Sequence, residues 1–294
     1  MIRSKMIVAC LLPALLLYLG LLVLPALQAF YISFFKASGF SDNMQWVGLS
    51  NYKALWNDEV FWRSIRNMFF ILIFGGIGIF SLAFLFTMFL SSGLKGKNFF
   101  RAFIFMPNVI AVIAVTTFWS FVFMPRYGLL TNSLKFLGLE QLAAVSWTAP
   151  SNVFWSMLVG LIWISSGFFT LLVLSGADKV PREMFESARL EGASLFQIFR
   201  YITVPMIWDV IVTAFVLWSI QTIKMMEFPY AFGGPNISQE LYTPAIYLYI
   251  MGFGQREPVY QLGYATAIGV AILICTVASV IVLRTLLRRD TVEY

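Results

Sequence analysis

The sequence between residues 181 and 205 reads PREMFESARLEGASLFQIFRYITVP. This stretch is polar and charged, has Gly192 near its middle and a proline at each end, and separates two long apolar runs. The runs on both sides have the length and composition of membrane-spanning helices. A polar segment between two spans does not belong in lipid, so it is a candidate docking surface for a soluble partner.

The composition of the chain indicates a membrane protein. It has 294 residues, of which 60% are hydrophobic, 17% aromatic and 12% charged, whereas soluble domains carry about 25% charged residues. Basic loops at a membrane explain the net charge of +6 better than nucleic-acid binding does. Cys10 and Cys275 lie in apolar runs and the chain has no histidine, so neither a disulfide framework nor a metal site is predicted.

Six segments contain the roughly 20 apolar residues that a spanning helix needs. The predicted spans are residues 7–31, 67–91, 102–124, 152–175, 206–227 and 260–283. The first span follows two basic residues as a signal peptide would. Its charge-free stretch is too long for one and no clean small-residue cleavage site ends it, so we expect it to be retained. The predicted fold is an all-α, polytopic membrane protein whose single domain covers residues 1–294.

The basic residues predict the orientation, because lysine and arginine are enriched in cytoplasmic loops. Those close to span ends on one side are Arg3, Lys5, Lys95, Lys97, Arg101, Lys179, Arg182, Arg189, Arg200, Arg284, Arg288 and Arg289. We therefore predict that both termini and the 181–205 segment are cytoplasmic. Gly93–Lys97 lacks the spacing and the hydroxyl residue of a nucleotide-binding loop, so this chain is not expected to hydrolyse ATP.

The 181–205 segment predicts two short helices joined by a sharp bend. Pro181 can occupy the first turn of a helix, and residues 182–191 can make about three turns of α-helix. Gly192 permits the break, residues 193–201 can form the second helix, and Pro205 begins the next span. Small residues around the bend let another backbone approach closely.

The run ESARLEGAS at residues 186–194, followed by Phe199, Ile202, Thr203 and Pro205, resembles the EAA loop of binding-protein-dependent ABC importer permeases. Ser187 and Glu191 stand where alanine and aspartate are commoner. In that family the loop forms a cytoplasmic coupling helix, here between the fourth and fifth spans, which fits a cleft in the ATPase subunit. The resemblance implies ATPase-coupling roles for Glu186, Ser187, Ala188, Arg189, Glu191, Gly192, Ala193 and Ser194.

The outer loops resemble the carbohydrate branch of this family, which includes the maltose and glycerol-phosphate type of permease. The residues that carry the likeness are Gly48–Tyr52, Phe61, Trp62, Asn67, Tyr127–Asn132, Lys224, Gly233–Pro235 and Tyr247–Phe253. The resemblance implies import of a sugar or sugar derivative across the bacterial inner membrane by alternating access. It also implies two partner ATPases that bind ATP and Mg, a second homologous permease subunit and an extracytoplasmic solute-binding protein, with no cofactor bound by this chain.

Polar side chains within the spans are the candidate substrate contacts, because they are costly in a bilayer unless they face a cavity or a partner. Sugars are bound by aromatic faces together with amides, hydroxyls and carboxylates. The candidates are Asn108, Trp119, Trp163, Ser165, Trp218, Gln221, Thr222, Lys224 and Glu227.

Each group of candidates also has a purely structural interpretation. Trp218, Gln221 and Thr222 could pack or hydrogen-bond between helices. Lys224 and Glu227 could form an ion pair. Asn108 could satisfy the backbone that Pro107 opens.

Other functions remain open from the residues. The imported solute could be a polyol or glycerol phosphate, and a channel is a further alternative, which uptake with an inactive partner ATPase would reveal. An intramembrane enzyme would need clustered nucleophile, base or metal ligands in the spans, and we find no such cluster in the sequence.

Overall fold

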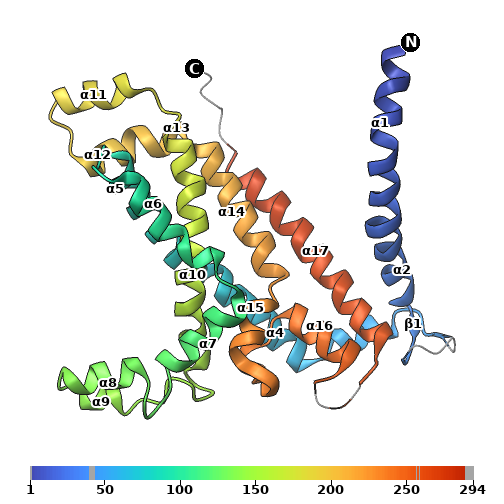
Figure 1. Cartoon of the computed structure of the whole chain (residues 1–294). Helices are drawn as coiled ribbons and strands as arrows, with labels where there is room; N and C mark the ends of the chain where they lie inside the picture. The colour runs from blue at the N-terminus through green and yellow to red at the C-terminus, as the bar shows by residue number, and fades with distance from the viewer. Residues whose placement is uncertain (1, 40–43, 256, 258, 289–294) are drawn as a thin grey trace. The chain divides into compact units, whose positions relative to one another are not determined.

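The computed structural model describes residues 2–39, 44–255, 257 and 259–288 (Figure 1). These residues are mainly helical, as the all-α prediction requires. The chain separates into two compact units, Met1–Phe61 with Pro244–Ile274 and Trp62–Thr243 with Cys275–Tyr294. The prediction that residues 1–294 form one domain stays a prediction, and Arg289, used to predict orientation, lies outside the described residues.

The first unit begins with one long apolar helix and a small hairpin. Its elements are α1 (Ile2–Tyr18), a π-helical turn (Leu19–Val23), α2 (Leu24–Ile32), β1 (Phe35–Lys36), β2 (Gln45–Trp46) and α3 (Ser50–Trp56). The strands pair antiparallel, with Phe35 opposite Trp46. The Asn51 amide donates to the carbonyls of Ser33 and Phe35, at 2.8 and 2.9 Å, and so fixes the hairpin to α3.

Asp58 organises the rest of the first unit, which contains the start of α4 (Glu59–Phe70), α16 (Pro244–Phe253) and the start of α17 (Leu262–Leu286). Its Oδ1 accepts hydrogen bonds from the amides of Val60 and Phe61, and its Oδ2 accepts from the hydroxyls of Tyr247 and Tyr264. Burial raises the pKa of Asp58, but these four hydrogen bonds together lower it below its ordinary value of 3.8.

The second unit holds most of the helices. After α4 come a π-helical turn (Ile71–Gly75), α5 (Gly76–Ser91), α6 (Lys97–Phe105), η3 (Met106–Val109), α7 (Val112–Val122), α8 (Leu129–Phe136), α9 (Glu140–Ala143) and α10 (Val153–Ala177). They are followed by α11 (Arg182–Leu190), α12 (Leu195–Ile198), η4 (Phe199–Thr203), α13 (Val204–Met206), α14 (Trp208–Ile223), α15 (Glu227–Gly233), η5 (Gly234–Asn236) and η6 (Gln239–Leu241).

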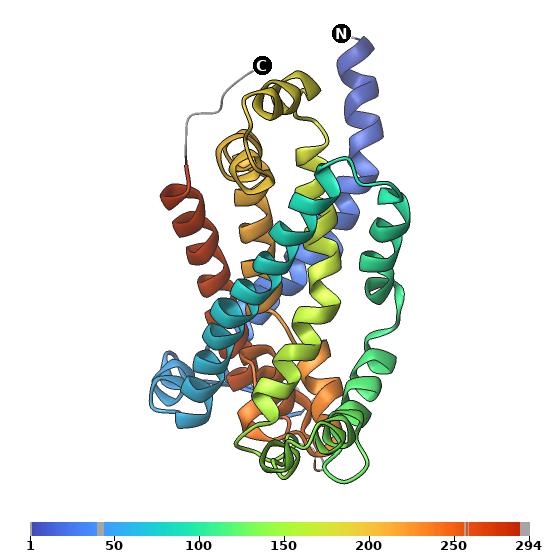
Figure 2. The same cartoon turned by 90° about the vertical axis from the view of Figure 1, so that its left-hand side faces the viewer.

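Helix α10 is the centre of this second unit. It packs against α5, α6, α7 and α14 (Figures 1 and 2), and Met157, Val173 and Leu174 on it are fully buried. Helices α11 and α12 lie at one end of α10, and α8 and α9 lie at the other (Figure 1). The 181–205 segment is thus located at one end of α10, the helix that packs against α5, α6, α7 and α14.

Four helical stretches of the described chain are long and apolar enough to span a membrane: 10–32, 59–91, 153–177 and 262–286. Two bent pairs bring the number to six if each pair counts as one span. The pair 97–109 and 112–122 bends by 95°, and the pair 195–206 and 208–223 bends by 78°.

The predicted span 102–124 is therefore broken in its interior, whereas the bend of the second pair falls at the start of the predicted span 206–227, whose helix 208–223 is continuous. Pro107 removes an amide donor inside the first of them, where the α-helix gives way to a 3₁₀ turn. Extended residues at 110 and 111 then complete that break.

Candidate functional site

A cavity of about 550 Å³ opens in the second unit where both bent pairs come beside α10. Its polar lining consists of Asn108, Ser165, Gln221, Lys224 and Glu227, which are five of the nine predicted substrate contacts. They come from η3, α10, α14 and the start of α15. Residues far apart in the sequence are thus brought to one concave surface, although each was selected only for being polar within a span.

The two charges of the cavity lie where the backbone changes direction. Lys224 is the C-cap of α14, and Glu227 is the first residue of α15. A cation at a helix C-terminus and an anion at a helix N-terminus are both favourable. Within the part of the chain that the structure describes, the two side chains form no ion pair with each other or with any third group. Both therefore remain available to a bound solute.

Asn108 reaches the cavity from η3. Its Nδ2 is buried and has no hydrogen-bond partner among the described residues, so this amide does not satisfy the backbone beside Pro107. Gly167 makes room for it, because a Cβ at that position would lie 2.6 Å from Nδ2. An unpaired buried donor costs free energy unless a ligand supplies its acceptor.

Trp119 and Trp163 lie outside this cavity, in the packing between α7 and α10. Their rings meet edge to face at 5.9 Å, and Trp119 stacks on Phe123 at 5.4 Å. Trp163 lines a separate, smaller cavity of about 230 Å³ beside Pro107. Trp119 and Trp163 were both predicted to contact the substrate, but neither lines the polar cavity.

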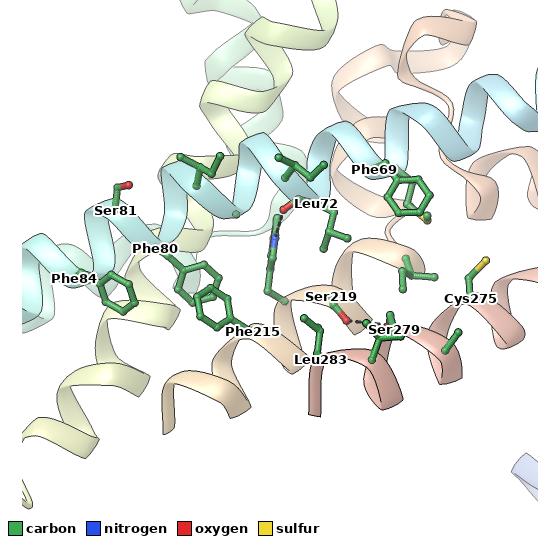
Figure 3. A pocket seen from close by; sticks show the side chains of 18 residues that line it. Phe69, Leu72, Phe80, Ser81, Phe84, Phe215, Ser219, Cys275, Ser279 and Leu283 are labelled. Atoms are coloured by element: carbon green, nitrogen blue, oxygen red, sulfur yellow. Dashed lines mark hydrogen bonds between the residues drawn. The ribbon is translucent and has the colours of Figure 1, made fainter. Parts of the chain in front are cut away.

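Figure 3 shows an apolar groove of about 720 Å³, with Phe80, Phe215 and Leu283 among its labelled side chains. Trp218 lies in the wall of this groove, on the other side of α14 from the polar cavity. It is 2% exposed, and its Nε1 donates to the Leu72 carbonyl at 3.0 Å. In the same groove Ser219 is hydrogen-bonded to Ser279 of α17. Thr222 is fully buried and lines neither cavity nor groove. Trp218 thus has the helix-packing arrangement that the sequence allowed as its alternative.

Seven apolar residues complete the lining of the polar cavity and were not predicted from the sequence, and three of them come from one segment. Met225, Met226 and Phe228 lie in and beside the short connection between α14 and α15. Met225 and Met226 lie between Lys224 and Glu227 in the sequence, and Phe228 follows Glu227. This proximity to two predicted contacts is the signal that could have identified them.

The 181–205 segment folds much as predicted. Helix α11 is followed by Gly192 with φ +81°, in the left-handed region that favours glycine. Ser194 then begins α12 with a capping box: its Oγ accepts from the Gln197 amide, and the Gln197 side chain accepts from the Ser194 amide.

This segment has an exposed face of mixed character. No residue of α11 is buried, while Phe185 packs partly against the core formed by Val173, Ala177, Val180, Ile207 and Ile211. Leu190, Phe196 and Tyr201 are 89%, 65% and 74% exposed. Large exposed side chains beside charged ones on a structured segment are typical of a protein interface.

Several spans, one of them broken beside a polar cavity, and an exposed helix between two spans define an integral membrane transport protein. Residues 54–291 match the family described as binding-protein-dependent transport system inner membrane component, and the chain belongs to this family. It is the permease component of an ABC transporter and not its ATPase.

The chain is similar to several named permeases. It is 28% identical to the trehalose/maltose transport system permease protein of Thermococcus litoralis, over 80% of this chain and 79% of that one. It is 27% identical to the sulfoquinovosyl glycerol transport system permease protein of Agrobacterium fabrum, over 90% and 86%. A solved bacterial ABC transporter involved in import of the polysaccharide alginate shares the fold, with a TM-score of 0.83, 22% identity and coverage of 99% and 97%.

Proposed function

We propose that this permease imports a sugar or sugar derivative across the inner membrane by alternating access. The observation that carries the proposal is the cavity in which Asn108, Ser165, Gln221, Lys224 and Glu227 converge. Amide, hydroxyl, ammonium and carboxylate groups together donate to and accept from hydroxyl groups on many sides of a solute. The relatives named for transport of trehalose, maltose and a sulfoquinovosyl glycerol support a sugar over a simple polyol or glycerol phosphate.

In this proposal the α11 end of the second unit and both termini face the cytoplasm. Two partner ATPases dock on residues 186–194, bind ATP and Mg, and move α11 when they close. A second homologous permease chain completes the pathway, and an extracytoplasmic solute-binding protein delivers the sugar to the opposite face. The exposed apolar side chains of the 181–205 segment support this docking, because the described part of the chain leaves them uncovered.

Uptake measurements test the substrate. Cells in which the chromosomal gene carries Gln221→Ala or Lys224→Ala would be offered radiolabelled sugars, polyols and glycerol phosphate. Losing one hydrogen bond to the solute should raise the KM for uptake by about 2- to 10-fold. Thr213→Ala is the matched control, because Thr213 lies on α14 but does not line the cavity. An unchanged KM in both cavity variants, or uptake without sugar selectivity, would contradict the proposal.

Variants of Gly192 test the docking. Apart from its two chain neighbours, no described residue has an atom within 4 Å of a Cβ built on Gly192, so a new side chain there is placed to meet a partner. Gly192→Leu should uncouple ATP hydrolysis from uptake or block assembly of the complex. Gly192→Asn is the control for backbone strain, because asparagine tolerates the left-handed conformation. Normal coupled transport by Gly192→Leu would remove the coupling assignment.

A further inference from the structure

At the α11 end of the second unit, two charged residues have the sign that the dipole of their own helix disfavours. Lys97 is the first residue of α6, and Asp178 is the C-cap of α10. A helix has partial positive charge at its N-terminus and partial negative charge at its C-terminus. The lysine and the aspartate are therefore each unfavourable within their own helix, and local structure gives no reason for either.

The two charges stabilise each other only through the contact between α6 and α10. Lys97 Nζ lies 2.6 Å from Asp178 Oδ1, and Arg101 Nη1, one turn further along α6, lies 3.3 Å from Asp178 Oδ2. Both carboxylate oxygens are thus engaged, and the three side chains are 29–34% exposed. We call Lys97, Arg101 and Asp178 the charge clamp. Ion pairs at this exposure add little to stability. The predicted cytoplasmic position accounts for the two basic residues, but neither reason explains why Asp178 lies between them.

A second contact joins the same region to α11. Arg189 Nη2 donates to the carbonyl of Ser92 at 2.9 Å, and Ser92 is the C-cap of α5. The turn from α5 to α6 is therefore tied to α11 by Arg189 and to the end of α10 by the charge clamp. Residues of this turn and of α11 face each other across a cavity of about 590 Å³, which leaves room for the parts to shift.

Helix α6 leads directly to the substrate cavity. Asn108 follows Lys97 by eleven residues, a distance of about 16 Å if helical. A displacement of the start of α6 would reach η3, where the span bends, and so the wall of the cavity that Asn108 forms. The opposite wall, with Gln221, is reached from α11 by another route, through α12, α13 and the bend at Ile207.

We propose that the charge clamp is a second transmission route, through which movement of α11 and the end of α10 repositions α6 and the Asn108 wall of the cavity. Lys97, Arg101 and Asp178 are positioning residues in this scheme, and none of them contacts the solute. The inference rests on the proposed function, since it concerns how ATPase movement reaches the sugar site.

The test compares charge reversal with charge exchange in the assembled transporter. Sugar uptake and ATP hydrolysis would be measured for each variant per amount of assembled complex. Asp178→Lys should lower the sugar taken up per ATP by about 5-fold or more, as usual couplings between sites do. The triple variant Lys97→Glu, Arg101→Glu, Asp178→Arg rebuilds the clamp with opposite signs and should restore the ratio to within about 2-fold of wild type, because coupling needs the pairing and not the signs.

Lys95→Glu is the matched control. It makes the same kind of charge change in the same turn, and Lys95 forms no ion pair among the residues that the structure describes. If Asp178→Lys fails to assemble, Asp178→Asn removes the charge at equal size, and the ratio of sugar to ATP should fall in that variant as well.

The outcomes separate this proposal from the proposed function. A wild-type ratio in the Asp178 variants, or an assembled triple variant that stays uncoupled, would overturn the charge clamp alone. Absence of sugar uptake by the wild-type transporter would overturn the proposed function, and with it the inference built on it.

Discussion

Substitution of Gly76 tests how α5 and α14 are packed. Its effect on the free energy of unfolding should change sign when Trp218, the neighbouring residue on α14, is removed. The Trp218 ring lies against α5, and a Cβ built on Gly76 would be 2.9 Å from the indole Nε1. A Cβ on Gly75 would be 3.0 Å from the same ring. The indole is also held by its hydrogen bond to the Leu72 carbonyl in the π-helical turn, so it cannot move away freely.

Two opposing terms set the size of the effect of Gly76→Ala. Alanine in place of glycine stabilises a helix interior by about 1 kcal/mol, whereas an extra carbon in a filled core costs about 1–3 kcal/mol. We expect Gly76→Ala to destabilise the wild-type chain by about 0–2 kcal/mol. Trp218→Ala alone should cost about 3–5 kcal/mol. Within the Trp218→Ala background the clash is absent, and Gly76→Ala should stabilise by about 1 kcal/mol.

The assay is the thermal midpoint of the purified permease in detergent, measured as the fraction that stays monodisperse after heating. Gly20→Ala is the control, because Gly20 is helical and, outside its own helix, no described residue lies within 4 Å of its added Cβ. Its effect should be the same in both backgrounds. If Gly76→Ala shifts the midpoint equally and in the same direction with and without Trp218, the packing argument is wrong.

Three further predictions concern polar contacts of Asp58, just before α4, and of Arg63 and Asn67 within it. The pKa of Asp58 is lower in the folded chain than its ordinary value of 3.8. The stabilising contribution of the ionised carboxylate is therefore complete above pH 3.8 and is lost as the pH falls through the pKa of the folded chain. A pH series of the thermal midpoint should show this loss in wild type and not in Asp58→Asn. The two N–H groups of Asn67 Nδ2 are shared among three backbone carbonyls, those of residues 239, 240 and 242, at 3.0–3.2 Å, so Asn67→Leu should lower the free energy of unfolding by about 1–3 kcal/mol. Arg63→Gln, which breaks an exposed ion pair to Glu240, should cost below about 1 kcal/mol, and equal losses for both variants would contradict this ranking.

The long unbroken spans were predictable because their length and apolar composition leave few alternatives. Helix α10 was predicted at 152–175 and runs from Val153 to Ala177, and α17 was predicted at 260–283 and runs from Leu262 to Leu286. The segment 206–227 was harder. Pro205 was expected to begin the span, but it lies within α13, and the bend comes two residues later at Ile207.

The composition of the cavity was predictable only in part, because α14 is apolar on every side and no stripe indicates which face meets a cavity. Gln221 and Lys224 face the polar cavity, while Trp218 faces the apolar groove. The general affinity of aromatic rings for sugars favoured Trp218 from the sequence. In lipid, however, an indole N–H needs an acceptor, and the Leu72 carbonyl supplies it.

The irregular backbone of the second unit follows a rule that ties its fold to its function. Non-helical backbone at membrane depth is tolerated only where it is covered by protein or lines a cavity. The bend at Ile207 is covered by the core around Val173 and Ala177, and the break after Pro107 lies beside Asn108 and the polar cavity. Helix α10, with 25 residues and no break, runs past both. A change of angle at either break therefore disrupts fewer helical hydrogen bonds than a bend introduced in α10.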